Sequence, residues 1–177
     1  YMSTLMLRLV DKKLAGLDDA IVAWLPNLPD ADRVTLRMLA NMTAGYPDYV
    51  QNQDLLRALY ENPFRQWTNA ELIEVGLSTP RVFAPGANWD YSHTNFVILA
   101  EAMQKIGGKP LDALLQEEVL GPMGLRRTVS STTAAIPEPA LHAFSAERRE
   151  AFGIPAGTRF YEESTYWNPS WTTAAGA

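Results

Sequence analysis

A long apolar helical pattern, entered through a tight turn and a short polar segment, constrains the fold of this chain most. Residues 83–108 read FAPGANWDYSHTNFVILAEAMQKIGG, with a turn signal at Pro85-Gly86 and a helix stop at Gly107-Gly108. The tripeptide Tyr91-Ser92-His93 therefore lies where a loop enters a helix, which is a common position for the polar side chains of a site. An ordinary polar helix start has the same composition. The face of the predicted helix carries Phe96, Val97, Leu99, Ala100, Met103 and Ile106.

The rest of the first two thirds of the chain also has helical periodicity. Apolar residues at helical spacing predict helices from the N-terminus to Val10 and over 21–25, 36–42, 55–60, 72–75 and 111–119. Thr68 and Glu71 have the spacing of a capping box, which is a specific helix start signal. We further expect caps from Asp18, from Thr35, and from Ser92 or Thr94. The best strand candidates are Leu141–Phe144 and Thr158–Tyr161.

These patterns predict a mainly α fold with few short strands. The 177 residues suit a single domain. We expect a helical region over 1–127, followed by a loop-rich segment over 128–177 in which Ser, Thr, Pro and aromatic residues replace the periodic pattern.

Composition excludes several classes of function. The net charge is -5 and the basic residues are scattered, so no basic face for nucleic acid is predicted. No apolar run is long enough to cross a membrane. The chain has no cysteine, and His93 and His142 lack ligand spacing, so we expect no metal and no cofactor. The adjacent acidic pairs are expected on solvated faces rather than facing each other across a sugar: Asp18-Asp19, Glu117-Glu118 and Glu162-Glu163.

Three blocks of the sequence resemble a known family. The blocks are LVDKKLAGLDDAIVAWLPNLP, VTLRMLANMTAGYPDY and FAPGANWDYSHTNFVILAEAMQKIGGKPLDALLQEEVLGPMGL. Their order and spacing are similar to those of the serine β-lactamase and penicillin-binding-protein superfamily, in its class C β-lactamase and D-alanyl-D-alanine carboxypeptidase/esterase branch. The segment SWTTAAGA is similar to a later block of the carboxypeptidases.

The resemblance implies a site built from Ser-x-x-Lys, Tyr-x-Asn and Lys/His-Thr-Gly. Tyr91 falls on the tyrosine of the second motif and would relay the proton of the nucleophile, provided that a lysine stabilises its anion. His93 stands where the family has Asn, and it would donate a hydrogen bond to the substrate. Trp171 falls near a site-lining Trp and would form a wall for the substrate. The alternatives are that Tyr91 packs at the helix entrance, that His93 caps or packs, and that Trp171 packs in an aromatic loop.

Two of the three motifs do not occur in these residues. No Ser lies three positions before any Lys, and no Lys-Thr-Gly or His-Thr-Gly is present. The resemblance places these motifs before Tyr1 and beyond Ala177. We therefore expect the chain to be the middle, helical portion of the β-lactamase/transpeptidase-like α+β fold, without most of its sheet and inactive alone. No signal peptide is visible in it.

The expected whole protein is a serine hydrolase that forms an acyl-enzyme with a β-lactam, a D-Ala-D-Ala peptide or an ester. Its partner would be that small-molecule or peptide substrate, and the family implies a location outside the cytoplasm. Apolar helix faces left uncovered by the sheet would favour self-association. The alternative is a non-catalytic helical module that binds a ligand or a protein.

Overall fold

The computed structural model describes residues 1–130, 133, 135, 138–163 and 167–172. In these residues the chain is mainly helical, and its one sheet has two short antiparallel strands, as the sequence predicts. The α-helices are α1 (Met2–Asp11), α2 (Leu36–Ala40), α3 (Gln53–Glu61), α4 (Asn69–Leu77), α5 (His93–Gly107) and α6 (Leu111–Leu115). The π-helical turn η3 (Gln116–Leu120) continues α6, and the 3₁₀ turns are η1 (Ile21–Ala23), η2 (Tyr49–Gln51) and η4 (Pro169–Thr172). The strands are β1 (Phe144–Ser145) and β2 (Tyr161–Glu162).

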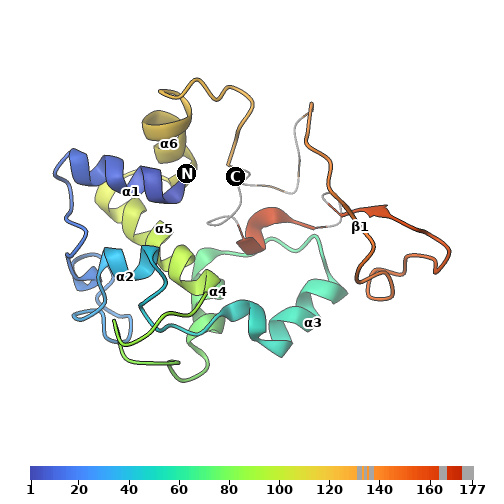
Figure 1. Ribbon diagram of the computed structural model, residues 1–177, viewed down its shortest axis with the longest axis horizontal. Coiled ribbons are helices and arrows are strands. Elements are labelled where there is room, and N and C mark those ends of the chain that lie inside the picture. Colours follow the sequence, from blue (N-terminus) through green and yellow to red (C-terminus); the bar gives the residue numbers. More distant parts are fainter. Residues whose placement is uncertain (131–132, 134, 136–137, 164–166, 173–177) are drawn as a thin grey trace.

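Helix α5 forms the centre of the molecule (Figure 1). It packs against α1, α2, α4, α6 and η2, and most of its middle is buried on all sides. A helix that is apolar nearly all round is expected in this position, because every face meets another element. Gly108 ends α5 in the left-handed conformation at φ 66°, as the Gly-Gly signal predicts.

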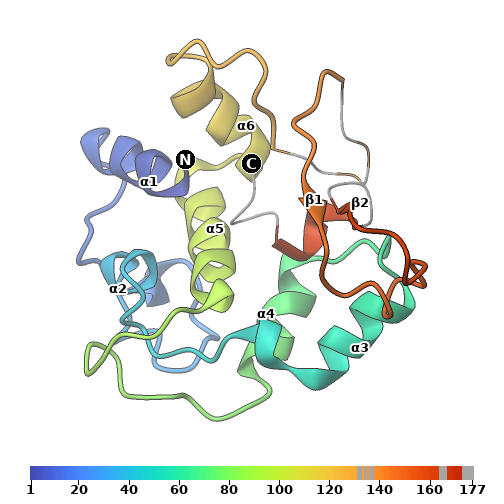
Figure 2. The same cartoon turned by 45° about the vertical axis from the view of Figure 1, so that its right-hand side comes forward.

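The remaining helices surround α5 in two groups. Helices α1 and α2 lie on one side of it, and α3 and α4 lie on the other (Figure 2). The predicted stripe of α1 faces inward, with Met2, Leu5, Met6 and Leu9 buried. The long connection between β1 and β2, and the segment after β2, both pack on α3: the ring of Tyr60 lies 5.9 Å from Phe152 of the connection and 6.1 Å from Trp167 after β2.

Several predicted local signals are confirmed. Thr35 caps α2 by accepting a hydrogen bond from the backbone N–H of Met38 (3.2 Å). The capping box is complete, since Glu71 N–H donates to Thr68 Oγ1 (3.2 Å) and Thr68 N–H donates to the Glu71 carboxylate (2.8 Å). The observed strands begin at the last residue of one predicted strand, Phe144, and of the other, Tyr161. The division of the chain at residue 127 stays a prediction.

Two expectations for acidic residues are wrong. Asp18 caps no helix: its carboxylate accepts two hydrogen bonds from Arg37 (2.7 and 2.9 Å), and only the 3₁₀ turn η1 forms after it. Glu118 is buried rather than solvated, because the π-helical turn η3 directs it toward α1. There it pairs with Lys12 and with Arg8 (3.8 Å).

The part of the chain that the structure describes contains neither a membrane-spanning helix nor a metal-ligand cluster. No helix in it combines the length and the apolar character needed to cross a bilayer. Within the same residues, no three His, Cys, Asp or Glu side chains come together as metal ligands.

Candidate functional site

The segment Pro47-Asp48-Tyr49 is hydrogen-bonded to residues 92–94 at the start of α5. The hydroxyl groups of Ser92 (3.2 Å) and Thr94 (2.6 Å) both donate to the carbonyl oxygen of Pro47. The backbone N–H of Tyr49 donates to Thr94 Oγ1 (3.1 Å). Ser92 and Thr94 are fully buried, so these bonds fix the loop against the helix away from water.

Asp48 provides the cap of α5 that the sequence assigns to Ser92 or Thr94. Its Oδ1 accepts from the backbone N–H of His93 (3.1 Å) and from that of Val50 (3.2 Å), so that it caps α5 and η2 together. Ser92 is the N-cap by position, but its side chain makes no cap bond. That prediction is wrong because both hydroxyl groups are used on Pro47, while a carboxylate from another segment reaches the helix N-terminus.

The same carboxylate contacts the ring of His93. Nδ1 of His93 lies 3.1 Å from Oδ2 of Asp48 and 3.2 Å from Oδ1. The Asp48 side chain is 9% exposed and the His93 side chain is 20% exposed, so the contact is largely shielded from solvent. An ion pair or a neutral hydrogen bond in this position is stronger than one on the open surface.

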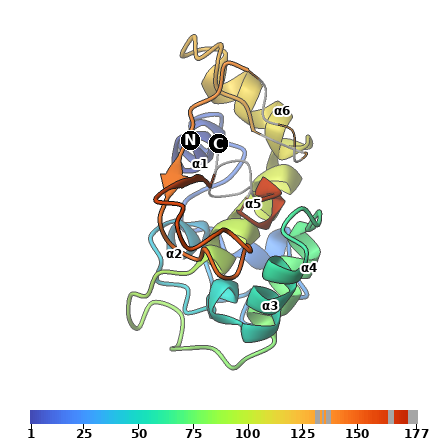
Figure 3. The same ribbon diagram turned by 90° about the vertical axis from the view of Figure 1, so that its right-hand side faces the viewer.

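The structure brings Tyr91, His93 and Trp171 together around the imidazole ring. Tyr91 meets His93 edge to face, with ring centroids 5.0 Å apart and an interplanar angle of 87°. Trp171 reaches the same ring from η4 at 6.4 Å, and Figure 3 shows η4 beside α5. Tyr49 completes the cluster at 5.6 Å. We call these four residues the aromatic cluster.

The two tyrosines of the aromatic cluster differ in their surroundings. Tyr49 is buried, and its hydroxyl donates to the backbone oxygen of Trp171 (2.7 Å). Burial, with the nearby negative charge of Asp48, raises the pKa of Tyr49 far above its ordinary value, so it stays a neutral donor. Tyr91 is 49% exposed, and no hydrogen bond occupies its hydroxyl among the residues described. Tyr91 is therefore the phenol of the cluster that can reach a ligand.

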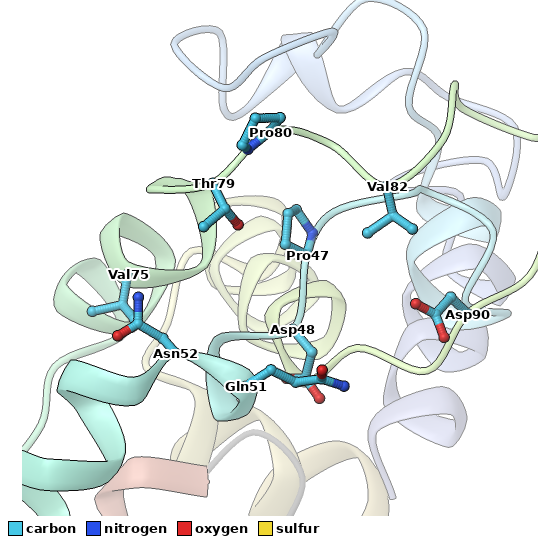
Figure 4. A pocket seen from close by; sticks show the side chains of 9 residues that line it. All are labelled: Pro47, Asp48, Gln51, Asn52, Val75, Thr79, Pro80, Val82 and Asp90. Carbon is cyan, nitrogen blue, oxygen red and sulfur yellow. The ribbon is translucent and has the colours of Figure 1, made fainter.

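A cavity of about 220 Å³ adjoins the aromatic cluster (Figure 4). Its lining comes from three segments: residues 47–52, residues 75–82, and Asp90 directly before Tyr91. Asp48 lines this cavity and also contacts His93, so it is shared by the two features. The charged residues of the lining are Asp48 and Asp90, both acidic.

The sequence of the chain as a whole matches one protein family. Residues 1–176 match the family described as Beta-lactamase. The chain belongs to the Beta-lactamase family. This match spans nearly the whole chain, and it confirms the resemblance on which Tyr91, His93 and Trp171 were selected as site candidates.

Relatives within the Beta-lactamase family agree with that assignment. The chain is 31% identical over 124 residues to a penicillin-binding protein of Bacillus subtilis (strain 168). The aligned residues make up 68% of this chain and 26% of the relative. It is 34% identical over 125 residues to the D-aminopeptidase of Brucella anthropi, covering 71% of this chain and 22% of the relative. Among solved structures, a D-stereospecific amidohydrolase from Streptomyces sp. matches 99% of this chain with a TM-score of 0.84 and 30% identity.

The chain is much shorter than these members of the family. It spans about a quarter of the two curated relatives, and 52% of the solved amidohydrolase chain. The helical architecture described above is thus shared with roughly half of a β-lactamase-type fold.

Asp48 and Tyr49 were not selected from the sequence as site residues. The only local signal was an acidic residue in a Pro-containing loop, which is typical of a turn or a cap. Nothing near Asp48 in the sequence indicates that its partner is His93, because that contact exists only after the loop has packed on α5.

Proposed function

We propose that this chain supplies the tyrosine element of the active site in a serine hydrolase of the Beta-lactamase family. The proposed reaction is the hydrolysis of an amide or peptide bond next to a D-amino acid through an acyl-enzyme. The observation that carries the proposal is the aromatic cluster, in which Tyr91, its exposed phenol, meets His93, and Trp171 reaches the same ring. The D-aminopeptidase and D-stereospecific amidohydrolase relatives support the substrate class.

In this proposal Tyr91 transfers protons. It accepts the proton of the serine hydroxyl as that oxygen attacks the carbonyl carbon, and it then gives the proton to the departing nitrogen. An unperturbed phenol, with a pKa of about 10, is too weak a base at neutral pH. Among the residues described, the rings that have an Arg over them are Tyr46, Trp67 and Phe160, not Tyr91, so the stabilising cation would be the lysine of Ser-x-x-Lys.

His93 and Trp171 would bind the substrate in this proposal. The imidazole replaces the family's Asn beside the reacting carbonyl, and the indole ring of Trp171 forms an apolar wall next to it. The whole protein would work outside the cytoplasm, as its resemblance to penicillin-binding proteins implies.

The test is the substitution Tyr91→Phe in the complete protein. We expect acylation by a fluorescent penicillin, and turnover of D-alanine p-nitroanilide, to fall by about 10²- to 10⁴-fold, the usual contribution of a general acid–base group. Tyr60→Phe is the matched control, because the ring of Tyr60 packs on Phe152 and Trp167 rather than on His93. Unchanged acylation in Tyr91→Phe would refute the proposal.

A second test concerns the isolated 177-residue chain, which contains no Ser-x-x-Lys. We expect intact-mass measurement after incubation with penicillin to show no covalent adduct. An adduct on the isolated chain would contradict this. If the complete protein also fails to form one, the alternative of a non-catalytic binding module is favoured.

A further inference from the structure

Asp48 holds His93 through two different groups. Its Oδ1 accepts from the backbone N–H of His93 at 3.1 Å, and both carboxylate oxygens lie within 3.2 Å of Nδ1. The ring also packs edge to face on Tyr91. The imidazole is therefore fixed in position by one carboxylate and one aromatic ring.

The contact also determines where the proton of the neutral imidazole lies. An ionised carboxylate can only accept hydrogen bonds, so Nδ1 facing it must carry the hydrogen. A neutral imidazole has one N–H, and Nε2 is then left with a lone pair on the far side of the ring from Asp48. Among the described residues, Nε2 of His93 has no hydrogen-bond partner.

The charges around the ring do not compete with this arrangement. The titratable groups that face His93 are Asp48, Tyr49 and Tyr91, and burial keeps Tyr49 neutral. In the part of the chain that the structure describes, no Lys or Arg forms an ion pair with Asp48. The carboxylate therefore serves only His93 and the N–H of Val50.

We infer that Asp48 is a positioning residue that fixes His93 as the Nδ1–H tautomer, so that Nε2 accepts a hydrogen bond from an N–H group of the substrate. The hydrogen bond from the substrate rests on the proposed function, whereas the tautomer of His93 does not. It reverses the role expected from the sequence, in which His93 replaces Asn as a donor. An amide side chain offers both a donor and an acceptor, whereas His93 held in this way offers an acceptor alone. The substrate group it selects is an amine or an amide N–H.

Asp48→Asn separates positioning from folding. The new Oδ1 can still accept from the N–H groups of Val50 and His93, and Asn is as good a helix cap as Asp. The amide nitrogen takes the place of Oδ2, 3.1 Å from Nδ1, and donates to it. Oδ1 lies 3.2 Å from Nδ1 but already accepts from the N–H groups of Val50 and His93, so we expect the ring to accept from the amide nitrogen and to move its own hydrogen to Nε2. The substitution thus reverses the tautomer while it keeps the cap.

The tautomer can be read by ¹⁵N NMR of the complete protein without substrate, at about pH 8.5, some two units above the ordinary imidazole pKa of ~6.5. The sequence has only two histidines, so His142→Gln assigns the signals. We expect Nδ1–H in the unmodified protein and Nε2–H in Asp48→Asn. Asp90→Asn is the control for general charge, because Asp90 shares the cavity with Asp48 but does not contact His93. It should leave the tautomer unchanged.

Kinetics give the second measurement. In Asp48→Asn, the donor at Nε2 would face the donor of the substrate, and we expect the KM for D-alanine p-nitroanilide to rise about 10-fold, while kcat changes less than about 2-fold. An Nε2–H signal in the unmodified protein would overturn the inference, even if the variant failed to fold. A reversed tautomer with an unchanged KM would overturn the substrate contact. Full acylation in Tyr91→Phe would instead overturn the proposed function and leave the NMR result standing.

Discussion

Thr94→Val tests how much stability comes from the Thr94 hydroxyl, one of the groups that bind the Pro47-Asp48-Tyr49 segment to the start of α5. Thr94 is fully buried, and its Oγ1 accepts from Tyr49 N–H (3.1 Å) while it donates to the Pro47 carbonyl (2.6 Å). Valine has nearly the same shape and the same branched Cβ, so the substitution removes the hydrogen bonds and leaves the packing volume in place.

The expected loss of stability follows from what each partner retains. The Pro47 carbonyl keeps the hydroxyl of Ser92 at 3.2 Å, so it is still hydrogen-bonded. Among the residues that the structure describes, the backbone N–H of Tyr49 has no second acceptor, so it would stay buried without a partner. An unsatisfied buried donor costs about 1–3 kcal/mol. We therefore expect the free energy of unfolding to fall by about 1–3 kcal/mol.

Urea denaturation followed by tryptophan fluorescence measures this difference. With a denaturant slope near ~2 kcal/mol per M, the unfolding midpoint should fall by about 0.5–1.5 M. Thr43→Val is the matched control. Among the described residues, the Thr43 hydroxyl bonds only to the exposed side chain of Asn41 (2.6 Å), so this substitution should shift the midpoint little. If Thr94→Val and Thr43→Val shifted the midpoint equally, the hydroxyl of Thr94 would not be what holds the segment.

Two further predictions concern packing and pH. In Gly76→Ala the new Cβ would lie 2.4 Å from Thr94 Oγ1, which is a clash. Overpacking costs about 1–3 kcal/mol, and alanine gains about 1 kcal/mol in helix propensity over glycine. The substitution should therefore destabilise the protein by up to about 2 kcal/mol in the same assay. Gly157→Ala, whose Cβ meets nothing within 4 Å, should be near neutral, and equal effects at the two glycines would contradict the clash. The hydrogen bond to Glu162 (2.6 Å), together with the negative charge of Glu162, raises the pKa of His142 above its ordinary value. The stability that this pair contributes is therefore complete below pH ~6.5, the ordinary imidazole pKa, and is lost as the pH rises through the pKa of the folded state. His142→Gln should therefore have a lower urea midpoint than the unmodified protein at acidic pH and the same midpoint at alkaline pH, and a constant difference would refute this.

Sequence patterns predicted the parts of the fold in which cause and effect lie within one helical turn. The Thr68–Glu71 capping box, the Thr35 cap and the Gly108 helix end each depend on residues no more than a few positions apart. The inward stripe of α1 follows from a period of 3.6 residues in the same way. Such features could be predicted because no distant element has to be placed first.

The predictions for the carboxylates of Glu118 and Asp18 failed because their partners come from distant parts of the sequence. Glu118 was expected in solvent, yet η3 turns it toward α1, where Lys12 and Arg8 neutralise it. Asp18 was expected to cap a helix, yet Arg37 offers it two charge-assisted bonds, which are stronger than a single backbone N–H. A carboxylate takes the strongest donor within reach, and in both cases the fold brings that donor from another segment.

The candidate site contains residues that the sequence predicted and residues, such as Asp48, that it did not. Tyr91, His93 and Trp171 were selected because the sequence resembles a family, and the structure then places all three in one cluster. Their roles stay predictions. The sequence around Asp48 indicates only a turn or a cap, since its contact with His93 depends on the hydrogen bonds of Ser92 and Thr94 that attach its loop to α5.

Asp48 also links the start of α5 to the state of the imidazole. Its Oδ1 caps the helix, and both of its oxygens lie within 3.2 Å of Nδ1 of His93, so one carboxylate performs a structural and a chemical task. Replacing the family's Asn by His at position 93 requires such a partner, because an imidazole without one exchanges its proton between two nitrogens and presents no fixed donor or acceptor. Since Asp48→Asn would preserve the cap and alter only the group facing Nδ1, the two tasks can be separated by one substitution. Because Asn preserves the cap, an unchanged tautomer in Asp48→Asn would mean that Asp48 is a cap alone. A reversed tautomer with unchanged stability would mean that the carboxylate positions the imidazole in addition to its role as a cap.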